Sequence, residues 1–198
     1  MRQKALMAVV ALVVVLLVGA PMAFASPNLV TNGSFETGDF TGWTEGANFE
    51  FTQVVSGAFY DYSGAEDGQF YATMGPVGSD GTLSQTFSDT AGGHYTFSFW
   101  LNAVGDDPSD FSASWDGTTL YSATDPNTGN VWTQFSFSTT GTGSDTITFS
   151  FRDDPAYIAL DNVSVTQSSG TTPEPSSLLL LGSGLLTVGG VIRRKFHR

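Results

Sequence analysis

Cysteine is absent from this chain of 198 residues, and basic residues are scarce outside its two ends. The absence of cysteine excludes a disulfide scaffold, catalysis by a thiol and zinc sites built from thiolates. Residues 26–172 carry one base, Arg152, against 18 acids, which gives them a formal charge of −17. Such a surface repels phosphate backbones, which argues against nucleic acid as a partner, and it attracts divalent cations.

Long apolar runs are confined to the two ends, and the first has the pattern of a secretory signal peptide. Arg2 and Lys4 precede an apolar run at 5–19, and residues 23–25 (Ala-Phe-Ala) form a small-x-small cleavage site before Ser26. A membrane anchor that stays attached is the alternative, but the run is short for a membrane span. We therefore expect residues 1–25 to be removed and the domain to be exported.

The second apolar run lies near the C-terminus and predicts a membrane-crossing helix. It occupies residues 176–192, between a polar lead-in and a basic end at 193–198. A helix of that length spans about 25 Å, just enough to cross the hydrocarbon, and the basic end would stay cytoplasmic. A buried core helix is the alternative, but the polar start and the basic end argue against it. Four glycines weaken the helix, which suits a temporary stop in the membrane.

A Pro-Glu-Pro tripeptide, a short apolar helix rich in Leu and Gly, and a terminal Arg cluster follow one another in this tail. Together they resemble the PEP-CTERM sorting tail of Gram-negative bacteria, over residues 172–198. The resemblance implies processing by exosortase, a membrane protease-transpeptidase, and delivery to the cell surface or extracellular matrix. Pro173, Glu174 and Pro175 would be its recognition motif. Whether the mature protein loses the tail stays open.

Between the two ends, apolar residues alternate with polar ones, and no sustained stripe with a helical period occurs. Gly- and Asp-rich turn signals separate the alternating segments. The expected strands are residues 28–31, 49–55, 69–74, 82–87, 94–103, 111–115, 131–138, 145–151 and 157–165. We therefore predict an all-β fold, a single jelly-roll β-sandwich over residues 26–167, followed by a polar linker at 168–172 and the sorting tail at 173–198.

The first and last of these segments carry a second resemblance. Residues 28–38 (Asn-Leu-Val-Thr-Asn-Gly-Ser-Phe-Glu-Thr-Gly), followed by Gly42-Trp43, resemble the opening of jelly-roll carbohydrate-binding modules and galactose-binding-like domains. Residues 157–165 (Tyr-Ile-Ala-Leu-Asp-Asn-Val-Ser-Val) resemble their closing strand. The resemblance implies that the first and last strands lie near one another in one sheet.

Pairing of those strands would bring Glu36 and Asp161 to one place, and oxygen ligands of this kind suit a hard cation. The resemblance implies that both carboxylates bind a structural calcium ion, helped by a backbone oxygen near Gly33. The apolar parity slips between Leu160 and Val163, which predicts a bulge that would redirect Asp161. The alternative is that both acids are solvated edge residues.

A glycan-binding surface would need exposed aromatic rings beside amide and hydroxyl groups. Period-two parity places Trp100 with Asn102 on the face opposite the Phe stripe, and Trp132 with Gln134 likewise. If the two strands are neighbours, one polar sheet face carries both indoles. The alternative is that a loop covers these Trp side chains.

Two acidic loops are interpreted as turns. Asp106, Asp107 and Asp110 lack the alternating spacing of a calcium loop, so we expect turn and solubility roles for them. Residues 153–155 (Asp-Asp-Pro) are expected to form a similar turn, with a salt bridge to Arg152.

Evidence for catalysis is weak, because residues 26–172 contain one histidine, His94, and no nucleophile motif surrounds a serine. No pair of carboxylates is singled out for glycosidase chemistry either. The sequence therefore predicts a non-enzymatic, exported protein of the cell surface or extracellular matrix. The alternative is a carbohydrate-binding module that adheres to extracellular polysaccharide. Its ligand and oligomeric state stay open.

Overall fold

The computed structural model describes residues 26–168, which form ten β-strands joined by turns and loops. The strands are β1 (Thr44–Ala47), β2 (Thr52–Ser56), β3 (Phe70–Met74), β4 (Gly81–Ser88), β5 (His94–Asn102), β6 (Ser109–Trp115), β7 (Thr118–Thr124), β8 (Thr133–Thr140), β9 (Ser144–Asp153) and β10 (Ile158–Gln167). The predicted signal peptide, most of the linker and the sorting tail lie outside the described residues. Within residues 26–168, no helix is long and apolar enough to cross a membrane.

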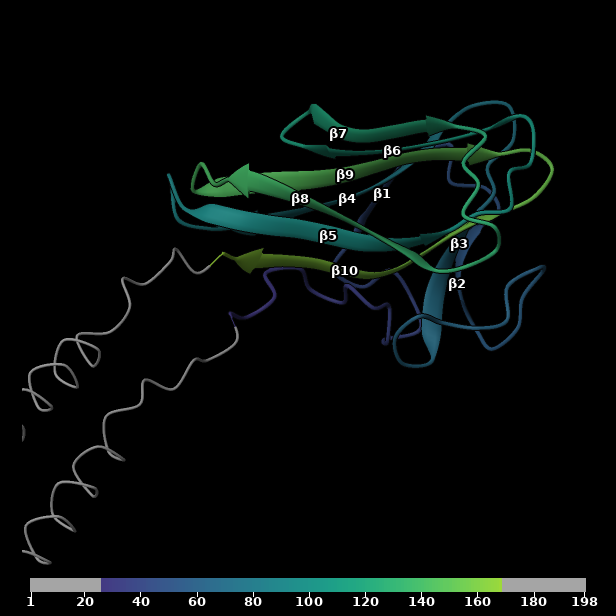
Figure 1. The fold of residues 1–198 in the computed structure, drawn as a ribbon, viewed down its shortest axis with the longest axis horizontal. Coiled ribbons are helices and arrows are strands. Elements are labelled where there is room, and N and C mark those ends of the chain that lie inside the picture. The colour runs from purple at the N-terminus through teal and green to yellow at the C-terminus, as the bar shows by residue number, and fades with distance from the viewer. Residues whose placement is uncertain (1–25, 169–198) are drawn as a thin grey trace, which may run out of the picture. The chain divides into compact units, whose positions relative to one another are not determined.

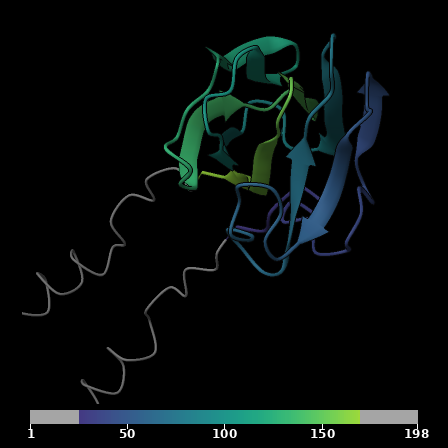
Figure 2. The same cartoon turned by 90° about the vertical axis from the view of Figure 1, so that its right-hand side faces the viewer.

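The strands form two antiparallel sheets of five strands each. One sheet has the order β1-β4-β9-β6-β7 and the other the order β2-β3-β10-β5-β8. Figure 1 shows β6 and β9 in one layer and β5 and β10 in the other, and Figure 2 shows the sandwich from its end. The predicted all-β sandwich is confirmed.

The core lies between the sheets, because alternation along each strand turns every second side chain inward. On β9, Ile147, Phe149 and Phe151 are fully buried, and on β5 so are Phe97 and Phe99. The rings of Phe99 and Phe149 meet edge to face, with their centroids 5.3 Å apart. Aromatic packing therefore joins the two sheets. Residues 26–168 hold this core within one compact unit, which is complete enough to fold alone.

The expected strands match the observed ones to within three residues at either end, with one exception described below. The sequence did not predict β1 and β7. Strand β1 (Thr-Glu-Gly-Ala) has no large apolar residue to reveal an alternation. In β7, an edge strand, Leu120 and Tyr121 are adjacent, and the pairing of β7 with β6 shifts register. Both strands form because a neighbouring strand offers its edge.

The expected strand at residues 28–31 is wrong, because side chains replace the main-chain ladder there. A single bridge pairs Asn28 with the last strand. The Asn28 side chain accepts from the Val165 amide at 2.9 Å and donates to the Val163 carbonyl at 3.1 Å. Gln85 binds both the amide and the carbonyl of Thr31, at 2.7 and 2.9 Å. The first segment still lies beside β10, as the resemblance implied.

The predicted bulge in β10 is confirmed. The pairing of β10 with β5 shifts register between Asp161 and Ser164, and Asn162 has a φ of 46°. The bulge receives the first segment of the chain, since the Val163 amide donates to the Gly33 carbonyl at 2.9 Å. A Cβ atom on Gly33 would overlap the carbonyl oxygen of Val163. The close approach of these two backbones therefore requires glycine.

Replacing Gly33 by alanine should destabilise the domain by about 1–3 kcal/mol, because the added methyl group must push the two backbones apart. Urea unfolding of residues 26–168 measures the change. The neighbouring Ser34→Ala is the matched control, since Ser34 makes one exposed hydrogen bond to Asp67 and should cost far less. Equal stability of the Gly33→Ala variant and the native domain would contradict the close approach.

Candidate functional site

Asp161 lies on β10 and is fully buried beneath the loop of residues 57–69, which we call the β2–β3 loop. Its Oδ2 accepts hydrogen bonds from the amides of Glu66 and Asp67, at 2.8 and 3.0 Å. Its Oδ1 accepts one from the amide of Asn162, at 2.7 Å. Burial nevertheless raises the pKa of Asp161 to about 7, and the charge of Glu66 adds to the rise. The ionised carboxylate is thus left short of positive charge.

Glu36 binds two amides where this loop ends and β3 begins. Its Oε1 accepts from Gln69 and Phe70, at 2.7 and 2.8 Å. A Cβ atom on Gly68 would overlap this carboxylate, so the loop can close on Glu36 only with glycine there. The structure therefore brings Glu36 and Asp161 to one short backbone segment, residues 66–70.

These residues have oxygen lone pairs left for a cation. Glu36 accepts both of its hydrogen bonds from backbone amides at Oε1, so within the described residues its Oε2 accepts no hydrogen bond. Asp161 Oδ1 accepts a single hydrogen bond. The Gly33 carbonyl, bound to the Val163 amide, keeps its second lone pair. Among residues 26–168, no three His, Asp or Glu side chains group closely enough to hold a metal ion by themselves. A cation here would therefore need backbone or water oxygens as well.

The four residues predicted to form a glycan-binding face lie in different environments. Trp100 and Gln134 are register partners on β5 and β8, half-buried and exposed respectively. Asn102 is buried, so it offers little to a ligand. Trp132 is half-buried, and its indole Nε1 donates to the Gly64 carbonyl at 3.0 Å. The structure thus places Trp100 and Gln134 side by side and ties Trp132 to the β2–β3 loop.

The β2–β3 loop covers part of this outer sheet face with a second apolar cluster. Tyr62 from the loop, Tyr71 from β3 and Ala159 from β10 are buried in it. The ring of Trp132 meets Tyr71 edge on, with centroids 5.8 Å apart. Packing of this kind uses the Trp132 ring for stability, which leaves less open aromatic surface on this face than the sequence predicted.

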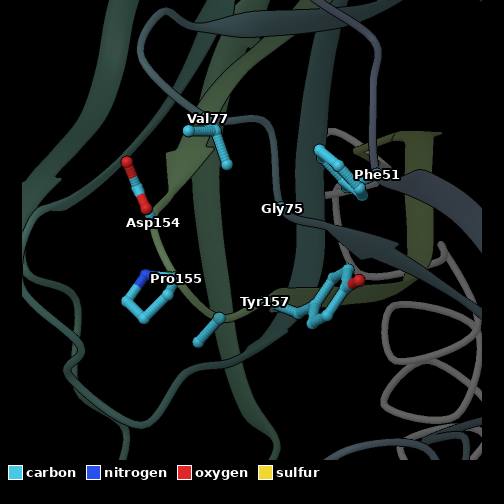
Figure 3. A pocket seen from close by; sticks show the side chains of 7 residues that line it. Phe51, Gly75, Val77, Asp154, Pro155 and Tyr157 are labelled. Atoms are coloured by element: carbon cyan, nitrogen blue, oxygen red, sulfur yellow. The ribbon is translucent and has the colours of Figure 1, made fainter.

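A hollow of about 200 Å³ opens at one end of the sandwich. We call it the end hollow, and the residues that line it are Phe51, Gly75, Val77, Asp154, Pro155, Ala156 and Tyr157. Figure 3 shows the rings of Phe51 and Tyr157 on one side, with Val77 and Asp154 across from them. A Cβ atom on Gly75 would lie 2.5 Å from the carbonyl oxygen of Ala156, so glycine keeps this part of the wall flat.

Exposed aromatic rings gather around the end hollow. Phe51 and Tyr60 are each 58% exposed. The rings of Phe59 and Tyr60 meet Tyr157 edge to face, with centroids 5.1 and 5.5 Å from it. The Tyr62 hydroxyl donates to the carbonyl of Tyr157 and fixes the backbone beneath this group.

Sequence reasoning missed Phe51 and Tyr157 as site residues. Both lie just before a strand, so period-two parity assigned them to strands 49–55 and 157–165. No local signal marked them, because aromatic residues that follow an acid are fully buried elsewhere in the domain, as Phe111 and Tyr62 are.

The acidic turns also differ from expectation. Arg152 pairs with Asp110 at 3.0 Å rather than with the acids that follow it. Asp154 is half-buried in the wall of the end hollow. Asp153 is 2% exposed, because alternation along β9 turns its side chain inward as it does Phe151. Residues 153–155 are therefore not simply a solvated turn.

Without divalent cations, the domain should lose stability as the pH rises from about 4 to about 7. The pKa of Asp161 is raised from 3.8 to about 7 by burial, so the folded state holds this proton over a range in which the unfolded chain releases it. Thermal melting in EDTA measures the trend. Asp161→Asn cannot titrate and should show a shallower fall, whereas an unchanged slope would contradict this source of the pH dependence.

The sorting tail matches a known protein-family model. Residues 171–195 match the PEP-CTERM protein-sorting motif, which confirms the resemblance predicted from the sequence. No curated protein matches the chain.

Solved structures resemble the described domain at low identity. TmCBM61 in complex with β-1,4-galactotriose is 20% identical with a TM-score of 0.53, covering 72% of this chain and 100% of the other. The CBM22-1 xylan-binding domain of Paenibacillus barcinonensis Xyn10C is 19% identical with a TM-score of 0.50, covering 75% and 99%. The enzymatically active domain of bacteriophage CBA120 tailspike protein 4 is 19% identical with a TM-score of 0.52, covering 71% and 21%.

These similar structures establish the fold, and the sorting motif indicates where the protein is sent. Carbohydrate-binding modules are prominent among the similar structures, although a tailspike domain also contains this fold. The PEP-CTERM motif implies export and sorting to the cell surface by exosortase. The chain therefore carries a PEP-CTERM sorting motif behind a jelly-roll domain with the fold of carbohydrate-binding modules.

Proposed function

We propose that residues 26–168 form a non-enzymatic surface domain that binds an uncharged polysaccharide at the end hollow. The observation that carries this proposal is the group of exposed or half-buried rings, Phe51, Tyr60 and Tyr157, around a concave site. A contiguous group of exposed apolar side chains often marks a surface that binds a ligand or a partner. A hollow edged by such rings suits the flat apolar faces of sugars.

The charge of the domain narrows the class of polysaccharide. Eighteen acids and one base in residues 26–168 repel uronic acids and sulfated sugars at a distance. Within the hollow, the Asp154 carboxylate is an acceptor for sugar hydroxyls. An uncharged hexose or pentose polymer therefore fits this surface best.

The similar structures support a glycan as the ligand. One was solved with a galactotriose and another is a xylan-binding domain, so neutral galactans and xylans are the first probes to use. The outer sheet face with Trp100 and Gln134 is the alternative binding surface, and the experiment below separates the two.

Catalysis is not part of the proposal. A glycosidase needs two carboxyl groups that flank the scissile bond, and the lining of the end hollow includes one, Asp154. His94 is exposed at the start of β5. The hollow lies toward the other end of that strand, where β5 ends at Asn102. The domain is instead suited to holding a polymer next to the cell.

The sorting tail determines where in the cell this binding would occur. Exosortase processing near Pro173, Glu174 and Pro175 would follow transient anchoring through residues 176–192 in the membrane of a Gram-negative host. The domain would then lie on the surface or in the extracellular matrix. Without a glycan ligand, it would serve there as an acidic structural component.

We also propose a structural calcium ion at Glu36 and Asp161, with the Gly33 carbonyl as a further ligand. The supporting observation is the fully buried Asp161 carboxylate, which has amides but no basic side chain within residues 26–168 to balance its charge. Bound calcium would supply the missing positive charge and hold the β2–β3 loop on the sheet.

Affinity electrophoresis through gels that contain galactan or xylan tests the glycan proposal. Tyr60→Ala and Tyr157→Ala should each weaken retention by about tenfold, because each removes a stacking ring. Val131→Ala, which truncates another exposed apolar side chain, is the matched control and should bind normally. Loss of retention in Trp100→Ala alone would move the site to the sheet face. Absence of retention on every polysaccharide would leave the structural role.

Glu36→Gln tests the calcium proposal. The amide oxygen that this substitution introduces can still accept the two loop hydrogen bonds, so the calcium-free domain should melt near the native temperature. Calcium binding at this site should raise the melting temperature of the native domain, and the Glu36→Gln variant should lack that rise. Asp39→Asn, at an exposed acid nearby, should keep the full response. A full response in Glu36→Gln would contradict the proposed ligand.

A further inference from the structure

Two carboxylates next to the end hollow have buried oxygens without partners. Asp153 closes β9 with its side chain turned inward, and its Oδ1 has no hydrogen-bond partner in the described part of the chain. Asp106, in the loop between β5 and β6, has a buried Oδ2 that likewise finds none among residues 26–168. Burial, followed by the charge of Asp106, raises the pKa of Asp153 to about 7. Ser109 pairs with Asp153 across β6 and β9, and its hydroxyl donates to the Asp106 carbonyl, so the structure brings the two acidic residues close together.

No basic side chain compensates this pair within residues 26–168. The base of this range, Arg152, directs its guanidinium to Asp110, with Nη2 and Nε both 3.0 Å from Oδ2. Asp125 and Asp154 add further negative charge to Asp153. Buried carboxylate oxygens without donors are rare in folded proteins, and a bound cation is one way in which such oxygens gain a partner.

A shared proton accounts for the pair less well than an ion. At the other end of the sandwich, Asp145 hydrogen-bonds directly to the carboxyl groups of Asp89 and Asp116, where one proton can serve two acids. Asp106 raises the pKa of Asp153 through its charge, and no hydrogen bond between the two side chains contributes to that rise. A shared proton would need such a hydrogen bond. Calcium bonds of 2.3–2.6 Å can span about 5 Å between two ligand oxygens.

We propose that Asp106 and Asp153 bind a calcium ion between the β5–β6 loop and the end of β9. Two carboxylates suffice for such a site, because calcium completes its coordination with backbone carbonyl and water oxygens. This site is separate from that of Glu36 and Asp161, since it uses different segments of the chain. It does not depend on glycan binding.

Bound calcium at this position would also stabilise one wall of the end hollow. Asp153 directly precedes residues 154–157, which form one wall of the hollow. Tyr62, whose hydroxyl binds the Tyr157 carbonyl, is near enough for the charges of Asp153 and Asp106 to add to the burial that raises its pKa. This consequence, that calcium strengthens glycan retention, rests on the proposed function.

The test uses residues 26–168 with the first site disabled by Glu36→Gln. Terbium luminescence excited through tyrosine should report binding, because Tyr62 is near enough to Asp153 and Asp106 for their charges to raise its pKa, and calcium should compete the signal away. Adding Asp106→Asn or Asp153→Asn should weaken binding by about tenfold or more, since each removes a charged ligand. Asp107→Asn, the exposed neighbour of Asp106, is the matched control and should leave binding unchanged.

Two outcomes would overturn the proposal. One is the absence of terbium and calcium binding in the Glu36→Gln domain, and the other is full binding in Asp106→Asn. If Asp153→Asn fails to fold, Asp106→Asn still decides, because Asp106 is only half-buried. Gel retention is measured in parallel with calcium and with EDTA. A domain that binds the ion but no polysaccharide would contradict the proposed function and leave the cation site standing.

Discussion

The buried carboxylate of Asp161 is the contact on which the arrangement of both candidate surfaces depends. It holds the β2–β3 loop against β10 through the amides of Glu66 and Asp67, and Glu36 holds the next turn of the same loop. Once fixed, the loop covers Trp132 on the sheet face and brings Tyr60 to Tyr157 at the end hollow. The contacts of Asp161 and Glu36 with the loop therefore cover the aromatic surface of the sheet face and bring together the rings at the end hollow.

The shortage of bases decides how this domain can compensate such buried acids. Asp145, Asp153 and Asp161 are all buried, and each is treated differently. Burial disfavours ionisation of Asp145, but hydrogen bonds from Asp89, Asp116 and Thr142 outweigh it and hold its pKa at about 2. Asp161 has backbone amides, and Asp153 has an oxygen without a partner in the described residues. In a domain with so few cationic side chains, the calcium ions that we propose would supply the missing positive charge.

Much of the fold followed from the sequence because alternation along a strand is a local signal. The slip in apolar parity near Asp161 located the bulge. The first and last segments of the domain, residues 28–38 and 157–165, carried the resemblance to carbohydrate-binding modules. The site was harder to predict, because a loop decided it. Nothing local shows that Gly64 accepts the indole proton of Trp132, or that the inward parity of β9 continues to Asp153. Contacts between residues far apart in sequence set the exposure of each ring and the burial of each acid.

We propose that cations neutralise these buried carboxylates, and native mass spectrometry can count the bound ions. Residues 26–168 would be stripped with EDTA, exchanged into volatile buffer with calcium, and weighed intact. We predict a folded domain that carries two calcium ions, one beside Asp161 and one beside Asp153. A folded domain that stays free of calcium at millimolar concentrations would contradict it, and the buried acids would then be kept neutral by protons alone.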